Sequence, residues 1–156
     1  MVFAEFVLEK WLKRGRFPEL KKPRGNNMDP IADLLSQIKN ALAVKKPLIS
    51  APFSNFKEAI IQLLIKLGYL KSVSRVGRGP KKFLKVELRY DENGEPLIKE
   101  IKKISKPGQR IYFSKKEIKP VKSGFGHLIV STPEGLMTDK EARKKGLGGE
   151  VIFEIF

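Results

Sequence analysis

The residue types that catalysis requires are sparse in this sequence. Its 156 residues include one histidine, His127, and no cysteine, which excludes thiolate chemistry and leaves no Cys/His set for a metal. Segment 77–82 (Gly-Arg-Gly-Pro-Lys-Lys) is glycine-rich and basic but lacks the spacing of a phosphate loop, so a hairpin turn explains it better. Asp139 and Glu141 fall in the first turn of a predicted helix, where the helix dipole favours acids. The sequence therefore predicts no catalysis, no cofactor and no metal site.

Two adjacent hydroxyls are the most specific candidates for binding chemistry. Ser131 and Thr132 end a predicted strand, just before Pro133-Glu134-Gly135. Hydroxyls on a rigid turn can both donate and accept hydrogen bonds, which suits the base edges and ribose 2′-hydroxyls of RNA. In the alternative interpretation, the same hydroxyls bond to their own backbone and form the turn. The pattern alone leaves both interpretations open.

Glycines, cations and one aromatic residue supply further candidates. Segment 146–149 (Gly-Leu-Gly-Gly) would let a backbone approach a ligand closely, or would simply connect a helix tightly to a strand. Lys39 and Asn40 lie on the polar face of a predicted helix, where they either follow a phosphate backbone or remain solvated. Tyr112 is the best candidate for an exposed aromatic ring on which a base stacks.

The net charge indicates the class of partner. Thirty-two Lys and Arg face 17 Asp and Glu, which gives a net charge of +15 spread over the whole chain. This excess opposes compaction unless a polyanion neutralises it, and nucleic acid gains affinity by releasing counterions. An anionic membrane is the competing partner, but no stretch approaches the ~18 apolar residues of a spanning helix, and no secretory signal is evident. We expect a cytoplasmic nucleic-acid-binding protein that is monomeric when free and does not bind membranes.

Two helices are predicted in the first half of the chain. Asp29 is expected to cap a helix that starts at Pro30, where the missing N–H costs nothing. Ser54 is expected to cap the second helix and Gly68 to end it. Apolar residues recur at helical spacing in both segments, and Phe56 is expected to lie on the inward face of the second helix.

The remaining elements are predicted mainly as strands. A short extended piece around Leu48–Ile49 separates the two helices, and segments 69–76 and 82–90 alternate in polarity and form a hairpin around residues 77–80. The second half is expected to begin with an extended segment 97–105, a type II turn at 106–109 and a returning segment 110–113. A capped turn at 114–117, a loop at 123–126 and a strand at 127–131 follow. Thr138 and Glu141 are expected to cap a helix that Gly146 ends, and the last strand is expected at 150–156.

The resulting fold class is α+β with two small domains. Residues 28–94 form an N-terminal helix-strand-helix-hairpin domain, and residues 95–156 form a C-terminal, mostly antiparallel β domain with short helices. Residues 1–27 are expected to form an N-terminal extension with a short amphipathic helix and a basic linker. Because Phe3, Phe6 and Trp11 are costly to expose together, the extension is expected to dock on a neighbouring protein or on this one.

Several motifs of the chain occur together in the order and spacing of a known family. The opening Met28–Leu35 and the segment Ile104–Tyr112 resemble the bacterial-type small-subunit ribosomal proteins numbered eight, a universal family. Further motifs match the C-terminal half of that family: Gly124–Gly126, Ile129–Thr132, Gly135–Asp139 and Gly146–Glu150. The resemblance covers residues 28–156 and leaves residues 1–27 without a counterpart.

The resemblance implies a structural, non-catalytic component of the small ribosomal subunit. Family members bind small-subunit ribosomal RNA early in assembly, on a central-domain helix with an irregular core, chiefly through the C-terminal domain. It also implies neighbouring small-subunit proteins, including the one numbered five, and in some bacteria repression of the protein's own operon through its mRNA. The alternative is a generic single-stranded nucleic-acid-binding protein outside the ribosome.

The resemblance also assigns roles to individual residues. Ser131 and Thr132 match the first two residues of the family's Ser-Thr-Ser turn, its main RNA-reading element, and Pro133 replaces the third serine. Glu150 matches an acidic residue that orders the binding surface. The full set of expected RNA-binding residues is Lys39, Asn40, Ser54, Lys57, Lys106, Arg110, Tyr112, Gly124, Ser131, Thr132, Gly148, Gly149 and Glu150.

Overall fold

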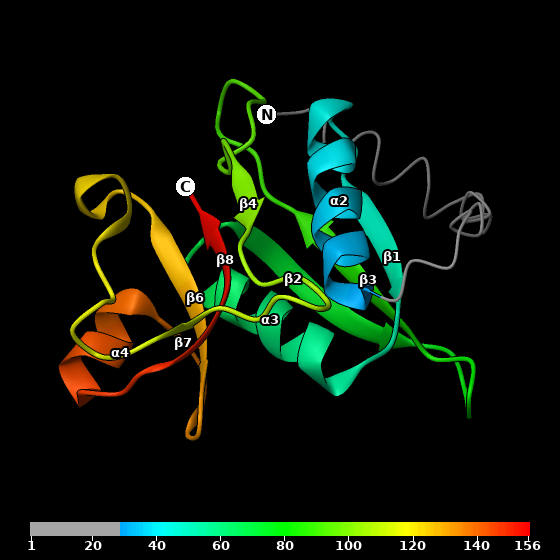
Figure 1. Ribbon diagram of the computed structural model, residues 1–156. Helices are drawn as coiled ribbons and strands as arrows, with labels where there is room; N and C mark the ends of the chain where they lie inside the picture. Colours follow the sequence, from blue (N-terminus) through cyan, green and yellow to red (C-terminus); the bar gives the residue numbers. More distant parts are fainter. Residues whose placement is uncertain (1–28) are drawn as a thin grey trace. The chain divides into compact units, whose positions relative to one another are not determined.

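A computed structural model describes residues 29–156 (Figure 1), so the predicted extension 1–27 lies outside the described residues. Three α-helices and two antiparallel sheets within the described part confirm the α+β prediction. In chain order the elements are α2 (Pro30–Ala43), β1 (Leu48–Pro52), α3 (Asn55–Lys66), β2 (Leu70–Val76), β3 (Phe83–Leu88), β4 (Ile101–Lys103), β5 (Tyr112–Phe113), the 3-10 helix η1 (Val121–Gly124), β6 (His127–Thr132), β7 (Gly135–Thr138), α4 (Asp139–Lys145) and β8 (Gly149–Ile155).

The described residues form two compact units. One contains residues 36–97, and the described residues of the other are 29–35 and 98–156. The first unit holds a three-stranded sheet of order β1-β3-β2. The second holds a five-stranded sheet in which β4, β8, β6 and β7 follow one another and β5 also pairs with β8.

Helix α2 begins as the sequence predicts. The Asp29 carboxylate accepts hydrogen bonds from the backbone N–H groups of Ile31 (3.2 Å) and Ala32 (3.1 Å), and Pro30 is the first helical residue. These bonds satisfy donors that the first turn of a helix otherwise leaves without partners. The predicted apolar face is buried at Leu34, Leu35, Ile38 and Leu42.

Helix α3 departs from the prediction at its start. Ser54 occupies the N-cap position, but its side chain makes no capping hydrogen bond. The prediction that Phe56 points inward is wrong, because the residue is 38% exposed. Phe56 is the second residue of the helix, and the fully buried positions begin one turn later, at Ile60 and Ile61.

The predicted hairpin of the first unit is confirmed. Strands β2 and β3 pair from Leu70 opposite Leu88 to Val76 opposite Phe83, with a bulge near the start of β2. Leu84, Val86 and Leu88 are buried, so one face of β3 belongs to the core.

The second unit is organised around β8. Strand β8 pairs with β4, β5 and β6, and β7 completes a tight hairpin with β6 that is closed by the pair Thr132 and Gly135. Two sequence-based expectations need correction. Of the predicted extended segment 97–105 only β4 is a strand, and of 110–113 only β5, which pairs with β8. Both differences arise because partners distant in sequence decide where a strand begins and ends.

Helix α4 confirms its predicted caps. Thr138 and Glu141 form a reciprocal capping box, and Gly146 ends the helix in the left-handed region at φ 67°. The helix packs against β6 and β7 (Figure 1). None of the helices in residues 29–156 has the length and apolar character needed to cross a membrane.

Candidate nucleic-acid interface

The sheet of the second unit brings three candidate residues into one row. Glu150 of β8 is paired with Tyr112 of β5 on one side and with Ser131 of β6 on the other. Paired residues of neighbouring strands place their side chains on the same face. Tyr112 is 66% exposed, and Ser131 and Glu150 are half-buried, so this row, which we call the Tyr112–Glu150–Ser131 row, is accessible from outside.

The two adjacent hydroxyls of the β6–β7 turn have different environments. The Thr132 hydroxyl donates to the carbonyl oxygen of Gly135 (2.9 Å) and accepts from the N–H of Glu134 (3.2 Å), and the residue is 8% exposed. Thr132 therefore has the turn-forming role that the sequence left open. In contrast, no hydrogen bond to any of residues 29–156 engages the hydroxyl of Ser131, which remains available to a partner.

Basic residues lie near Glu150, the middle residue of the row. The guanidinium of Arg110 lies 3.1 Å from the carboxylate of Glu150, and Lys106 is exposed on the preceding turn. Lys103 of β4 forms an ion pair with Asp29. Burial lowers the pKa of Lys103, and the positive charges of Arg110 and Lys106 lower it further, against the opposing effect of Glu150. Lys103, Arg110 and Lys106 are therefore close enough for their charges to interact, a grouping that the sequence alone does not indicate.

A buried serine holds the cationic turn in place. The Ser105 hydroxyl donates to the carbonyl oxygen of Val151 (2.6 Å) and accepts from the N–H of Ile111 (3.0 Å), and Ser105 is 1% exposed. It therefore fixes both ends of the 106–110 turn against β8. Gly108, at φ 84°, supplies the left-handed residue that the predicted type II turn requires. Ser105 was not among the predicted site residues, although its place inside the Ile104–Tyr112 motif was a usable signal.

The glycines expected near the ligand serve the protein's own packing. A Cβ atom on Gly149 would lie 2.1 Å from the carbonyl oxygen of Ser131, and one on Gly148 would lie 2.6 Å from that of Phe113. The two glycines thus allow the start of β8 and the residue before it to lie close to the backbone of neighbouring segments. Gly124 differs, because no atom lies within 4 Å of the place where its Cβ would stand.

The remaining expected residues lie in the first unit. Lys39 and Asn40 are exposed on α2, and Ser54 is half-buried at the start of α3. Lys57 is 7% exposed, which leaves little of its side chain accessible to a phosphate.

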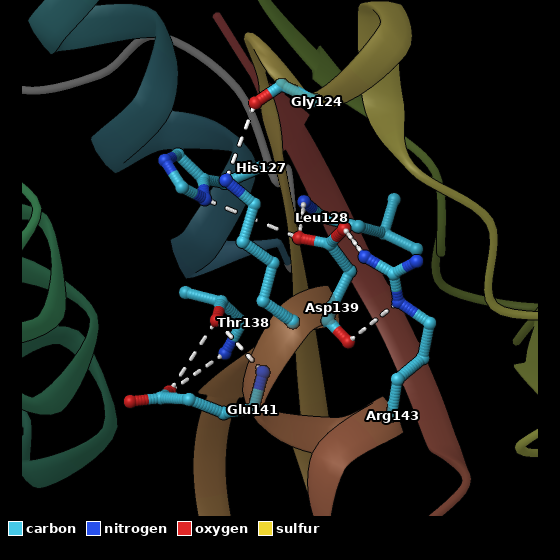
Figure 2. Close-up of polar contacts among 8 residues, drawn as sticks. Gly124, His127, Leu128, Thr138, Asp139, Glu141 and Arg143 are labelled. Atoms are coloured by element: carbon cyan, nitrogen blue, oxygen red, sulfur yellow. Dashed lines mark hydrogen bonds and ion pairs between the residues drawn. The ribbon is translucent and has the colours of Figure 1, made fainter.

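A polar network supports the opposite end of β6 (Figure 2). The fully buried carboxylate of Asp139 accepts from the N–H of Leu128 (3.3 Å) and pairs with the guanidinium of Arg143 (3.2 Å). His127 Nδ1 lies 4.0 Å from the same carboxylate. Asp139, which the sequence explained only by the helix dipole, therefore ties α4 to β6. Among residues 29–156, no three potential ligands gather as a metal site would require.

We expect the single histidine to titrate below its ordinary pKa. Burial lowers the pKa of His127 from 6.5, and nearby Lys140 adds to the effect, against Asp139 and Glu141. A histidine with a lowered folded pKa binds fewer protons in the folded than in the unfolded state. Its contribution to stability is therefore complete above pH 6.5 and is lost as the pH falls through the folded pKa. An NMR titration, in which the one imidazole gives an unambiguous signal, should show a midpoint below 6.5; a midpoint above it would contradict the expectation.

Comparisons with known proteins give a consistent picture. The sequence model of the family described as "Ribosomal protein S8" matches residues 29–156. A protein of Clostridium botulinum (strain Eklund 17B / Type B), "Small ribosomal subunit protein uS8", is 47% identical over 124 residues, which cover 80% of this chain and 94% of that protein. The protein of the same name from Thermus aquaticus is 44% identical over 135 residues, covering 82% of this chain and 98% of its own length.

Proposed function

This chain belongs to the ribosomal protein S8 family, and from that premise we propose that it binds small-subunit ribosomal RNA through the Tyr112–Glu150–Ser131 row. Proteins of this family are constituents of the small ribosomal subunit with a structural rather than a catalytic role, and the chain is one of them. The observation that carries the proposal is the unengaged Ser131 hydroxyl at one end of the row. The exposed ring of Tyr112 forms the other end, and the middle residue, Glu150, pairs with Arg110.

The chemistry of the row suits folded RNA. A-form RNA hides its major groove, so a protein reads bases exposed at irregularities, together with 2′-hydroxyls in the shallow groove. Ser131 can donate to or accept from such groups, and Tyr112 offers a ring for stacking. The cations, including Arg110 and Lys106, lie where a phosphate backbone would pass, and they position the protein without reading sequence.

The finer features of the proposal follow from the resemblance of the motifs. We place the RNA target in the central domain of the small-subunit RNA, at a helix with an irregular core, and we assign its recognition to residues 95–156. The ribosomal protein numbered five is the proposed protein neighbour, and a similar structure in the protein's own operon mRNA is a second RNA target.

Separate removal of the two hydroxyls tests the row. The probes are a small-subunit RNA fragment with the irregular helix and an uninterrupted RNA duplex. We expect Ser131→Ala to weaken binding of the fragment by about 5- to 150-fold, because a polar RNA group loses its partner. Binding of the duplex and the unfolding midpoint should not change. Thr132→Val should instead lower the unfolding free energy by about 1 kcal/mol, because it removes the bonds that close the turn.

Ser36→Ala provides a matched control, since Ser36 is an exposed serine on α2. It should change neither RNA affinity nor folding. If Ser131→Ala weakens binding of the fragment and of the duplex equally, Ser131 contacts only the sugar-phosphate backbone of RNA and does not recognise the irregular helix. Unchanged binding of both RNAs by Ser131→Ala would refute the assignment of the row.

A further inference from the structure

The sheet of the first unit leaves one face open. Along β3, the buried residues Leu84, Val86 and Leu88 alternate with Phe83, Lys85 and Glu87, which lie on the opposite face. The strand register extends this face across all three strands. Its rows are Leu48–Glu87–Ser72, Ser50–Lys85–Ser74 and Pro52–Phe83–Val76.

One end of the open face is apolar. Phe83 is 37% exposed in the central strand, and its two register partners, Pro52 and Val76, are exposed as well, Val76 to 47%. A phenylalanine ring flanked by two small apolar side chains gives a flat platform on which a nucleobase can stack.

The hairpin turn beside this platform is basic and well defined. Arg78, Lys81 and Lys82 are exposed, and none of them forms an ion pair with another of residues 29–156. The turn is closed so tightly that a Cβ on Gly77, at φ 103°, would lie 2.1 Å from the carbonyl oxygen of Lys81. In Figure 1 this turn, drawn in green, extends beyond the end of the sheet. The sequence has no acidic residue between Glu58 and Glu87.

We propose that this end of the sheet, the Phe83 platform with the basic turn 77–82, binds an unpaired nucleotide of RNA. The base stacks on Phe83, and the adjoining phosphates contact Arg78, Lys81 and Lys82. The proposal deepens the proposed function and rests on it for the class of partner. It adds a second contact that lies in the other structural unit from the Tyr112–Glu150–Ser131 row.

The charge around the platform favours RNA over a protein partner. The turn lies in a stretch of the sequence, residues 59–86, that has no acidic residue. Its exposed cations can therefore attract a phosphate backbone and release its counterions. An apolar protein surface would gain from Phe83 and Val76, but it would leave these cations without partners at its edge. Stacking also needs no particular base, so the contact adds affinity at a single-stranded segment without reading its sequence.

A single-stranded probe separates this contact from the row. The full chain is titrated with a fluorescein-labelled oligouridylate of about 12 nucleotides. Phe83→Ala should weaken its binding by about 5- to 150-fold, whereas Phe83→Tyr, which keeps a ring, should retain it. Lys81→Gln should reduce the slope of log affinity against log salt by about 0.7. Phe125→Ala is the matched control, because Phe125 is an 86% exposed phenylalanine at another site; it should leave the affinity unchanged.

The outcomes distinguish the two proposals. If the oligouridylate does not bind the wild-type chain, or if Phe83→Ala and Phe125→Ala weaken it equally, the Phe83 platform is not an RNA contact. A loss in Phe83→Tyr as large as that in Phe83→Ala would likewise overturn the stacking role. In each of these cases, the effect of Ser131→Ala on the irregular RNA fragment would still stand. If Ser131→Ala leaves binding of the irregular fragment unchanged while Phe83→Ala weakens binding of the oligouridylate, the Tyr112–Glu150–Ser131 row is not an RNA contact, whereas the Phe83 platform is one.

Discussion

Gly149→Ala should destabilise the protein by about 3 kcal/mol or more, at or above the usual range for overpacking, because the three atoms nearest to the new methyl group all belong to the backbone. The added Cβ would lie 2.1 Å from the carbonyl oxygen of Ser131 and 3.2 Å from the Cα of Thr132. Backbone atoms cannot rotate away as side chains do, so β8 and β6 must separate where Glu150 pairs with Ser131. Urea unfolding should show the loss of stability, and binding of the irregular RNA fragment should be lost with it.

Gly108→Ala is the control that isolates the clash. No atom lies within 4 Å of a Cβ on Gly108, so this substitution introduces only the strain of a left-handed residue at φ 84°. That strain costs about 1–2 kcal/mol. If Gly149→Ala is no more destabilising than Gly108→Ala, then β6 and β8 can move apart without penalty, and the row is less rigid than its register indicates.

The parts of the fold that depend on local sequence could be predicted. The Asp29 cap, the hairpin around residues 77–80 and the capping box of α4 each involve residues within a few positions of one another. The signals for these features are short-range hydrogen bonds and alternating polarity, which a single sequence displays directly. Ser131 and Thr132 were recognised for the same reason, as hydroxyls beside a turn.

The geometry of the site could not be predicted, because it depends on long-range pairing. Nothing near Tyr112 indicates that β5 pairs with β8, which is what places Tyr112 beside Glu150 and Ser131. The division of roles between Ser131 and Thr132 depends on the direction of each side chain in the hairpin. The prediction for Phe56 failed differently: helical spacing suggested an inward ring, but tertiary packing leaves the residue 38% exposed. Lys57 stays a predicted RNA contact, with a side chain that packing leaves only 7% exposed.

Asp139 should prove to be the most sensitive polar residue of the second unit. Its fully buried carboxylate connects α4 to β6 by accepting from the N–H of Leu128, and it also pairs with the guanidinium of Arg143 within α4. Asp139→Ala leaves the buried N–H of Leu128 without an acceptor, whereas Arg143, at 34% exposure, can turn towards water. We therefore expect a loss of about 2–4 kcal/mol in the free energy of unfolding, measured in urea.

Asp139→Asn divides this loss into its parts, since the amide oxygen can still accept from Leu128 while the charge opposite Arg143 is gone. It should fall between the wild type and Asp139→Ala. Glu134→Gln removes an acid from an exposed pair with Lys145 and should leave the unfolding midpoint unchanged. If Asp139→Ala unfolds at the same urea concentration as Glu134→Gln, the network in Figure 2 does not hold α4 to the sheet. If it unfolds earlier yet retains RNA affinity, the network stabilises the scaffold without shaping the row, as its place at the other end of β6 implies.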